Sequence, residues 1–267
     1  MADLIIRQAA QSDIPTLKEL WQVCFGDELS YIDIFFNEMF IADNTVVAEF
    51  NNDVVGVVHL LKRKLNDKAF LYGYAIGVFP EYRGKSICKS MLDKIKEYTE
   101  KNNILFGLHP ANKKLAEFYQ KIGLNAMYSL KEVDATSFSY DEKYILDDIT
   151  VDEFLNMRKE AFKNCVEWDK NALNYMLKNC ETVKKTNIDG NIRYFVISKH
   201  NDLLTIKETT AKDDEIIKVS SSIKEYYNAK KIRYLLSSDG ALQGVIKPVI
   251  YGFLPKDDNV YMNLFLD

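Results

Sequence analysis

The stretch Val78-Phe-Pro-Glu-Tyr-Arg-Gly-Lys-Ser-Ile-Cys88 decides how this chain is interpreted. It follows an apolar and aromatic run at 70–79 that is typical of a buried strand. It precedes apolar residues that share one helical face, namely Ile87, Met91, Leu92, Ile95 and Tyr98. Such a strand, turn and helix start presents free backbone N–H groups and a positive helix end, which together suit a phosphate.

The turn itself combines a strand stop, a glycine and basic side chains. Pro80 ends the strand, and Gly84 allows the backbone to approach a ligand closely. Arg83, Lys85 and Lys89 add positive charge. The pattern is neither the nucleotide P-loop, G-x-x-x-x-G-K-[ST], nor the dinucleotide fingerprint, G-x-G-x-x-G. An ordinary strand-to-helix turn with solvated basic residues is the alternative interpretation.

Residues 78–92 resemble the acetyl-CoA signature of the GCN5-related N-acetyltransferases (GNAT). The resemblance implies that backbone amides of the turn hold the CoA pyrophosphate. The turn would comprise Arg83, Gly84, Lys85, Ser86, Ile87 and Cys88. Two positions depart from the family pattern, because Ser86 replaces a glycine and Cys88 replaces a glycine or alanine. We expect Ser86 to lie in the first helical turn with a negative φ, which serine adopts without strain.

A second segment, Pro110–Leu124, resembles the family pattern N-x-x-A-x-x-F-Y-x-K-x-G-F. Taken from the residues alone, Asn112 is a good N-cap, an apolar stripe follows, and Gly123 ends the helix. The resemblance implies that Asn112 contacts the cofactor and that Tyr119 donates a proton to the departing CoA thiolate. The alternative for Tyr119 is a packed aromatic side chain.

Composition narrows the class of protein. The 267 residues suffice for one large core or two ordinary ones. With 35 basic and 39 acidic residues, the net charge of −4 gives no basic field for nucleic acid or an anionic membrane. Four separated cysteines and three histidines argue against a structural metal site and a disulfide framework. No apolar run approaches about 18 residues, so we expect a cytoplasmic protein without membrane contact.

The pattern of periodic segments predicts an α+β fold of two consecutive GNAT-like domains, each a mixed, mostly antiparallel sheet flanked by helices. We place the acetyl-CoA-binding domain at 1–134, a polar linker at 135–147 and a second domain without a cofactor motif at 148–267. The layout resembles tandem family members of the enhanced intracellular survival type. Expected strands in the first half are 4–7, 46–50, 54–61, 69–79, 104–108 and 125–133, and expected helices are 12–25, 29–41, 86–101 and 112–122. The second half is expected to hold helices at 151–163, 168–179 and 213–230, and strands at 182–188, 192–199, 203–208, 232–237, 244–252 and 259–266.

The expected activity is direct attack of a primary amine, of a small molecule or a peptide, on the thioester of acetyl-CoA. We expect the strand at 74–79 to splay from the strand at 104–108, so that Ile76, Gly77 and Val78 offer backbone groups to the donor. The Val78 N–H would polarise the acetyl carbonyl. Small residues on this strand could alternatively serve only to let a helix pack closely.

An alkylamine is mostly protonated at neutral pH, so the reaction needs a base. The candidates are Glu49, His109 and the terminal carboxylate of Asp267, whereas His59 shares a face with apolar residues and is expected in the core. The aromatic segment Tyr31, Phe35, Phe36 and Phe40 could line an acceptor pocket, although its helical spacing favours the core. A non-catalytic acyl-CoA sensor, or a partner-binding protein, is the alternative function. The sequence indicates neither the acceptor, the acyl-chain preference nor the oligomeric state.

Overall fold

The computed structural model describes residues 4–65, 68–178 and 181–253. The chain divides into two compact units. Of the described residues, one unit comprises 4–127 with 250–253, and the other comprises 128–249. The domain boundaries at 134 and 148 stay a prediction, and each unit is described by itself.

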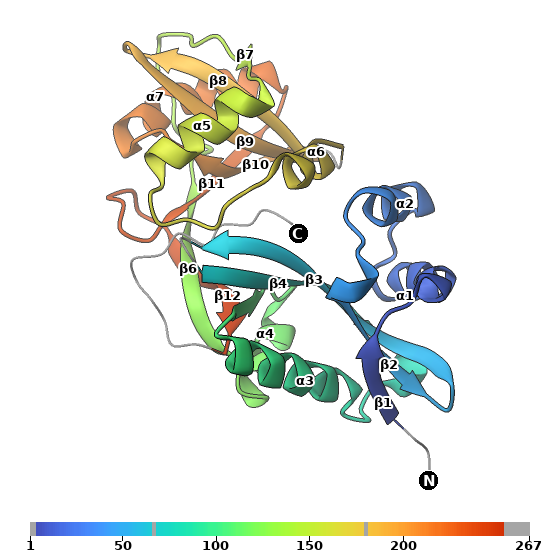
Figure 1. The fold of residues 1–267 in the computed structure, drawn as a ribbon. Helices are drawn as coiled ribbons and strands as arrows, with labels where there is room; N and C mark the ends of the chain where they lie inside the picture. The colour runs from blue at the N-terminus through green and yellow to red at the C-terminus, as the bar shows by residue number, and fades with distance from the viewer. Residues whose placement is uncertain (1–3, 66–67, 179–180, 254–267) are drawn as a thin grey trace. The chain divides into compact units, whose positions relative to one another are not determined.

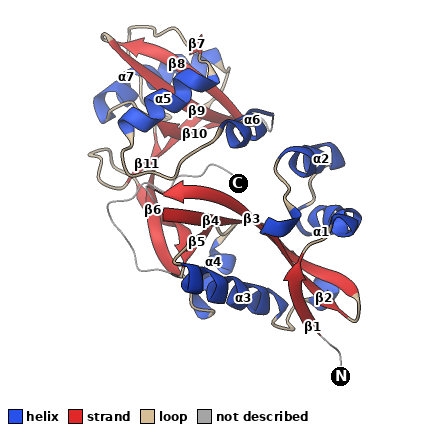
Figure 2. Ribbon diagram, viewed as in Figure 1, coloured by secondary structure: helices blue, strands red, loops and turns tan. Residues whose placement is uncertain are grey.

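The first unit contains a mixed sheet in the order β1-β2-β3-β4-β5 (Figure 2), to which the end of β12 adds beside β5. All neighbouring strands run antiparallel except β4 and β5, which are parallel. The strands are β1 (Leu4–Gln8), β2 (Thr45–Phe50), β3 (Asp53–Leu65), β4 (Lys68–Val78), β5 (Leu105–Leu108) and β12 (Val245–Gly252). Asn51 and Asn52 form the turn between β2 and β3, both with positive φ, as the predicted hairpin requires.

Helices cover both faces of this sheet (Figure 1). They are α1 (Ile14–Phe25), α2 (Leu29–Glu38), α3 (Ile87–Asn102) and α4 (Lys113–Lys121). On one face, a Cβ added to Gly77 of β4 would lie only 2.6 Å from the Leu20 side chain of α1. On the other face, a Cβ added to Gly56 of β3 would lie 3.1 Å from the Met91 side chain of α3. The core between α3, α4 and the sheet includes Met91, Leu92, Phe106, Tyr119 and Leu124.

The second unit repeats the plan with a sheet in the order β6-β11-β10-β9-β8-β7, in which only β10 and β11 are parallel. The strands are β6 (Asn125–Asp134), β7 (Asp147–Asp148), β8 (Glu181–Ile188), β9 (Asn191–His200), β10 (Leu203–Thr209) and β11 (Lys231–Ser237). The helices are α5 (Val151–Ala161), α6 (Lys170–Lys178) and α7 (Asp213–Tyr226). The predicted α+β fold, with two sheets that are mostly antiparallel and flanked by helices, is confirmed.

Residues 135–147 have no long element, as expected, but they contribute Ala135, Tyr144 and Leu146 to the second core. The apolar members of this polar segment therefore anchor it to the second unit. The strand expected at 259–266 lies outside the described residues. Within the described ranges, no helix combines the length and the apolar character that a membrane span requires.

Candidate acyl-transfer site

Strands β4 and β5 separate at the carboxyl end of their ladder. Their pairing runs from Phe70–Leu105 to Gly73–Leu108 and then stops, although β4 continues to Val78. A register shift against β3 accompanies Ala75, whose φ is 45°. The expected splay is therefore present, and beyond Gly73 none of the described strands pairs with this edge of β4.

The amides of this free edge alternate in direction. The Phe79 N–H donates to the Val55 carbonyl of β3 at 3.0 Å. Because successive amides of a strand point to opposite sides, the Val78 N–H points away from β3, toward the side that β5 has left. The Val78 carbonyl accepts from Nε of Arg83 at 2.9 Å. Val78 thus offers its N–H on the open edge while Arg83 fixes its carbonyl.

The turn after β4 differs from the expectation at Ser86. Helix α3 begins only at Ile87, so Ser86 is the residue before the helix rather than part of its first turn. Its φ and ψ are 61° and 11°, and Gly84 also has a positive φ, of 77°. The prediction of a negative φ at Ser86 is wrong, because the backbone must pass through a left-handed residue to enter the helix. This conformation costs an L-residue about 1–2 kcal/mol, which is the physical reason for glycine at this position of the family pattern.

The N-terminus of α3 receives no hydrogen bond from a capping side chain among the described residues. By contrast, α4 and α5 are capped by Asn112 and Thr150, whose side chains accept from backbone N–H groups at 3.0 Å and 3.2 Å. Lys85 is exposed, with Nζ 4.9 Å from the centroid of the Tyr82 ring. An uncapped helix start beside basic side chains is an arrangement that binds an anion.

A pocket of about 370 Å³ lies in the first unit and opens along the free part of β4. Helices α1 and α2 and the loop between them contribute Trp21, Phe25, Asp27 and Tyr31 to its wall. Residues 72–76 of β4 form a second wall, and the α4 side contributes His109, Ala111, Leu115 and Tyr119. Of the predicted site residues, Ile76 and Tyr119 thus line one pocket.

Tyr119 is 5% exposed, and its pKa is raised by burial and, to a smaller extent, by the neighbouring Cys88. Burial likewise raises the pKa of the Cys88 thiol to about 12. Both groups are therefore protonated at neutral pH. Tyr119 also packs in the core below α4, so the packed aromatic and the pocket residue are one side chain.

Two other predicted site residues have structural roles. Asn112 caps α4 through the N–H of Leu115, so its carbonyl oxygen is engaged there. Gly77 lets α1 pack against β4, because a Cβ would lie 2.6 Å from Leu20 and 3.1 Å from the Cys24 sulfur. The close-packing alternative therefore holds at Gly77, whose backbone remains part of the strand.

The three candidate bases differ in where the structure places them. His109 lines the pocket. Glu49 accepts from Nε of Arg7 at 2.7 Å and does not belong to the pocket wall. Asp267 lies outside the described residues. His59 is 1% exposed in the core, as expected.

Sequence patterns did not identify most of the aromatic side chains that line the pocket. Trp21 is 3% exposed and packs in the core as an apolar residue of α1 would, but it also lines the pocket. Asp27 follows the helix end and carried no signal. Of the aromatic segment after it, Tyr31 lines the pocket, whereas Phe35 and Phe36 are buried in the core. Helical spacing cannot distinguish a core position from a pocket wall when both share one helix face.

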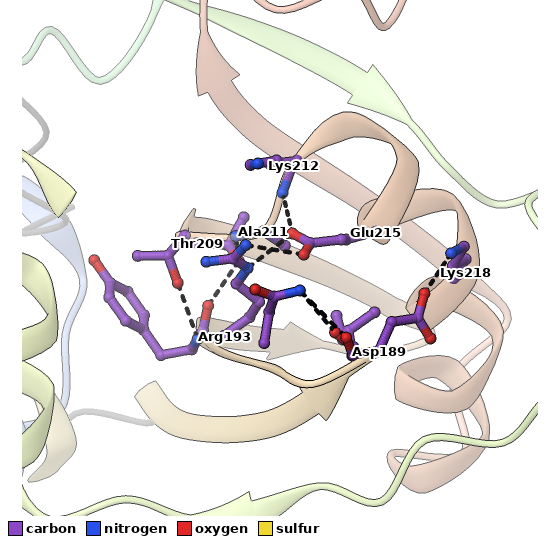
Figure 3. A network of polar contacts seen from close by, with 11 residues as sticks. Asp189, Arg193, Thr209, Ala211, Lys212, Glu215 and Lys218 are labelled. Carbon is purple, nitrogen blue, oxygen red and sulfur yellow. Dashed lines mark hydrogen bonds and ion pairs between the residues drawn. The ribbon is translucent and has the colours of Figure 1, made fainter.

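The corresponding junction of the second unit is filled by its own side chains (Figure 3). Strand β10 leads into α7 as β4 leads into α3. The Glu215 carboxylate accepts from the backbone N–H of Lys212 at 2.7 Å and from Arg193 at 2.8 Å and 2.9 Å. Asp213 accepts from the N–H of Leu242 at 2.9 Å. Carboxylates thus occupy this helix start, where an added phosphate would meet like charge.

Comparisons with known proteins agree with this geometry. Residues 5–127 match the acetyltransferase (GNAT) domain family. No curated protein matches the chain in sequence. A GCN5-related N-acetyltransferase from Anabaena variabilis is similar with a TM-score of 0.67 at 16% identity, over 93% of this chain and 72% of that one.

Two further structures are similar in fold. A probable N-acyltransferase from Enterococcus faecalis has a TM-score of 0.72 at 12% identity, over 94% of this chain and 72% of that one. Eis1 from Mycobacterium abscessus has a TM-score of 0.62 at 10% identity, over 94% of this chain and 73% of that one. The likeness of fold therefore extends over both units.

Proposed function

We propose that this chain is an N-acetyltransferase that moves an acetyl group from acetyl-CoA to a primary amine by direct attack, since residues 5–127 match the GNAT acetyltransferase domain family. The observation that carries the proposal is the free edge of β4, which leads from a pocket containing Tyr119 to the uncapped start of α3. Its β10–α7 counterpart holds carboxylates instead, so we further propose one donor site per chain, in the first of two tandem domains.

The residues present fit acetyl-CoA in both shape and charge. A pantetheine arm carries amides that need partners, and the free edge of β4 around Ile76, Gly77 and Val78 supplies them. The pyrophosphate would lie on the backbone N–H groups of residues 84–88, next to Lys85. The left-handed Ser86 supports this role, because the strained residue keeps its N–H while turning the chain into the helix.

The chemistry is a single substitution at the acyl carbon. The amine nitrogen forms a bond to the carbonyl carbon, the carbon–sulfur bond breaks, and the CoA sulfur leaves with the electron pair. Tyr119 gives its phenolic proton to that sulfur, and because burial raises the pKa of the phenol, this proton is present at neutral pH. The Val78 N–H lies on the free edge, where it can stabilise the developing oxyanion.

His109 is the base that we propose for the proton lost by the amine, since it lines the same pocket as Tyr119. Glu49 is less suited, because its carboxylate is engaged by Arg7. The sensor alternative keeps donor binding and drops this chemistry. The two functions therefore differ in turnover and agree in affinity for acetyl-CoA.

Calorimetric titration with acetyl-CoA, followed by assay of free thiol release with a panel of primary amines, tests the proposal. Lys85→Glu should weaken acetyl-CoA binding about tenfold or more, whereas Lys101→Glu, the same charge change at the far end of α3, should not. Tyr119→Phe should lower kcat while leaving the acetyl-CoA affinity unchanged. Binding without turnover for any amine would favour the sensor, and absence of binding would refute both functions.

A further inference from the structure

The aromatic wall of the acyl-transfer pocket points to one class of acceptor. We propose that the acceptor is a small arylalkylamine, a monoamine with one flat apolar group, whose ammonium is recruited by Asp27. The inference rests on the proposed function and assigns the substrate class of the same site.

Aromatic side chains of α1, α2 and β4 form much of the pocket wall. The Trp21 ring lies 6.0 Å from Phe25, 6.5 Å from Tyr31 and 5.7 Å from Tyr74, centroid to centroid. Tyr72 adjoins Tyr74 at 6.3 Å. All five residues line the pocket. Phe25 and Tyr31 are the least buried of the five, so they can offer ring surface to a flat apolar group and to a cation, each contact with a cation contributing about 0.5–2 kcal/mol.

One carboxylate accompanies these rings. Asp27 lies directly after Gly26, the left-handed residue that ends α1, and its Oδ2 accepts from Nε1 of Trp21 at 2.8 Å. Among the described residues that line the pocket, Asp27 is the only carboxylate and no lysine or arginine is present. The pocket wall therefore carries one negative charge, which matches the single ammonium of a monoamine. Spermidine or an aminoglycoside has further ammonium groups, and these would find aromatic rings but no second carboxylate in the wall.

The size of the pocket limits the acceptor further. Its volume of about 370 Å³ must also receive the acyl end of the donor, because Ile76 and Tyr119 line the same space. Phe25, which is 44% exposed, lies at the rim of the pocket. Trp21 and Tyr74 are only 3% and 7% exposed and therefore form its interior. A ring of one or two fused cycles on a short alkyl chain fits between them, with the amine directed toward the donor.

The contact between Asp27 and Trp21 could also serve only to close the end of α1, so the test must separate charge from structure. Asp27→Asn keeps an oxygen that can accept from Nε1 of Trp21 and removes the charge. Glu28→Gln is the matched control, since Glu28 is exposed, adjacent and outside the pocket wall. Phe25→Leu removes a ring at the rim, where the fold does not depend on it.

The experiment is steady-state acetylation of 2-phenylethylamine, butylamine, spermidine, an aminoglycoside and a short peptide with a free α-amine. We expect 2-phenylethylamine to have the highest kcat/KM. Asp27→Asn should raise its KM about tenfold with an unchanged KM for acetyl-CoA, and Phe25→Leu should raise it about threefold. Glu28→Gln should match the parent chain.

Three results would overturn the inference. A preference for spermidine, the aminoglycoside or the peptide would show that the aromatic wall does not select the acceptor. An Asp27→Asn variant with the parent KM for 2-phenylethylamine would limit Asp27 to its structural contact. If acetyl-CoA binds and other amines are acetylated, only the acceptor class fails, whereas the absence of donor binding removes the proposed function as well.

Discussion

His59 should make the first unit less stable as the pH falls below 6.5. Its side chain is 1% exposed, and its ring lies 4.8 Å from Phe35 and 5.8 Å from Trp21. Its Nδ1 is 3.2 Å from the Thr45 hydroxyl, and its Nε2 has no hydrogen-bond partner among the described residues. Burial among apolar rings lowers the pKa of His59 from 6.5 to about 3.

The sign and size of the effect follow from this lowered pKa. Below pH 6.5 the unfolded chain takes up a proton at this histidine and the folded chain does not, so protons favour unfolding. The stability present above pH 6.5 is lost progressively until the pH reaches the folded value near 3. At about 1.4 kcal/mol per pH unit, the loss at pH 5 is about 2 kcal/mol, a large share of the 5–15 kcal/mol typical of a domain.

Urea unfolding at pH 7.5, 6 and 5 checks the prediction. The chain has two tryptophans, so a Trp168→Phe background leaves Trp21, beside His59, as the fluorescence reporter of the first unit. The free energy of unfolding is compared with that of His59→Phe, because the difference cancels the other titrating groups. The variant should gain about 2 kcal/mol on the parent between pH 7.5 and pH 5. His200→Gln, which removes an exposed histidine, is the control. A difference that stays constant with pH would refute the reasoning.

Three further substitutions test local features. Ser86→Gly should raise the free energy of unfolding by up to about 1 kcal/mol, because glycine adopts the left-handed φ of 61° without strain. Ser90→Gly, inside α3, should lower it by a similar amount. Thermal unfolding distinguishes the two. Asn112→Ala should cost about 1 kcal/mol because α4 loses its cap, and Asn112→Asp should restore most of it in the same assay. Glu208→Gln should cost about 3–5 kcal/mol in urea unfolding, since it leaves Arg158 charged and 3% exposed; a loss below 1 kcal/mol would contradict this account of the ion pair.

The sequence predicts the junction of β4 and α3, where we propose that the donor binds, well because its signals are local. An apolar run, a proline and a helical stripe place β4, the turn and α3 to within a few residues. The sign of φ at Ser86 was missed because it depends on whether the helix begins at residue 86 or at residue 87. A shift of one residue at a helix boundary is below what patterns distinguish, yet it changes a relaxed residue into a strained one.

The acceptor side is different because its wall is assembled from distant parts of the chain. Trp21, Tyr74 and Tyr119 belong to α1, β4 and α4, and each looks like an ordinary core residue in its own element. Trp21 satisfies both descriptions, since its ring packs against Phe35 and its indole N–H donates to Asp27. Only the folded chain shows that the three residues line one pocket.

The proposed donor and acceptor contacts come from different kinds of chemical group, and this difference has a kinetic consequence. The donor contacts we propose are largely backbone amides of β4 and the start of α3, which tolerate changes of side chain. The acceptor contacts that we propose are side chains of α1, α2, the loop that joins them and β4, and none of them belongs to the turn that leads into α3. Substitutions at Asp27 or Phe25 should therefore change the KM of the amine while that of acetyl-CoA stays constant, and changes at Lys85 should do the reverse. One fold can thus keep its donor while its acceptor changes, because the two are held by different kinds of chemical group.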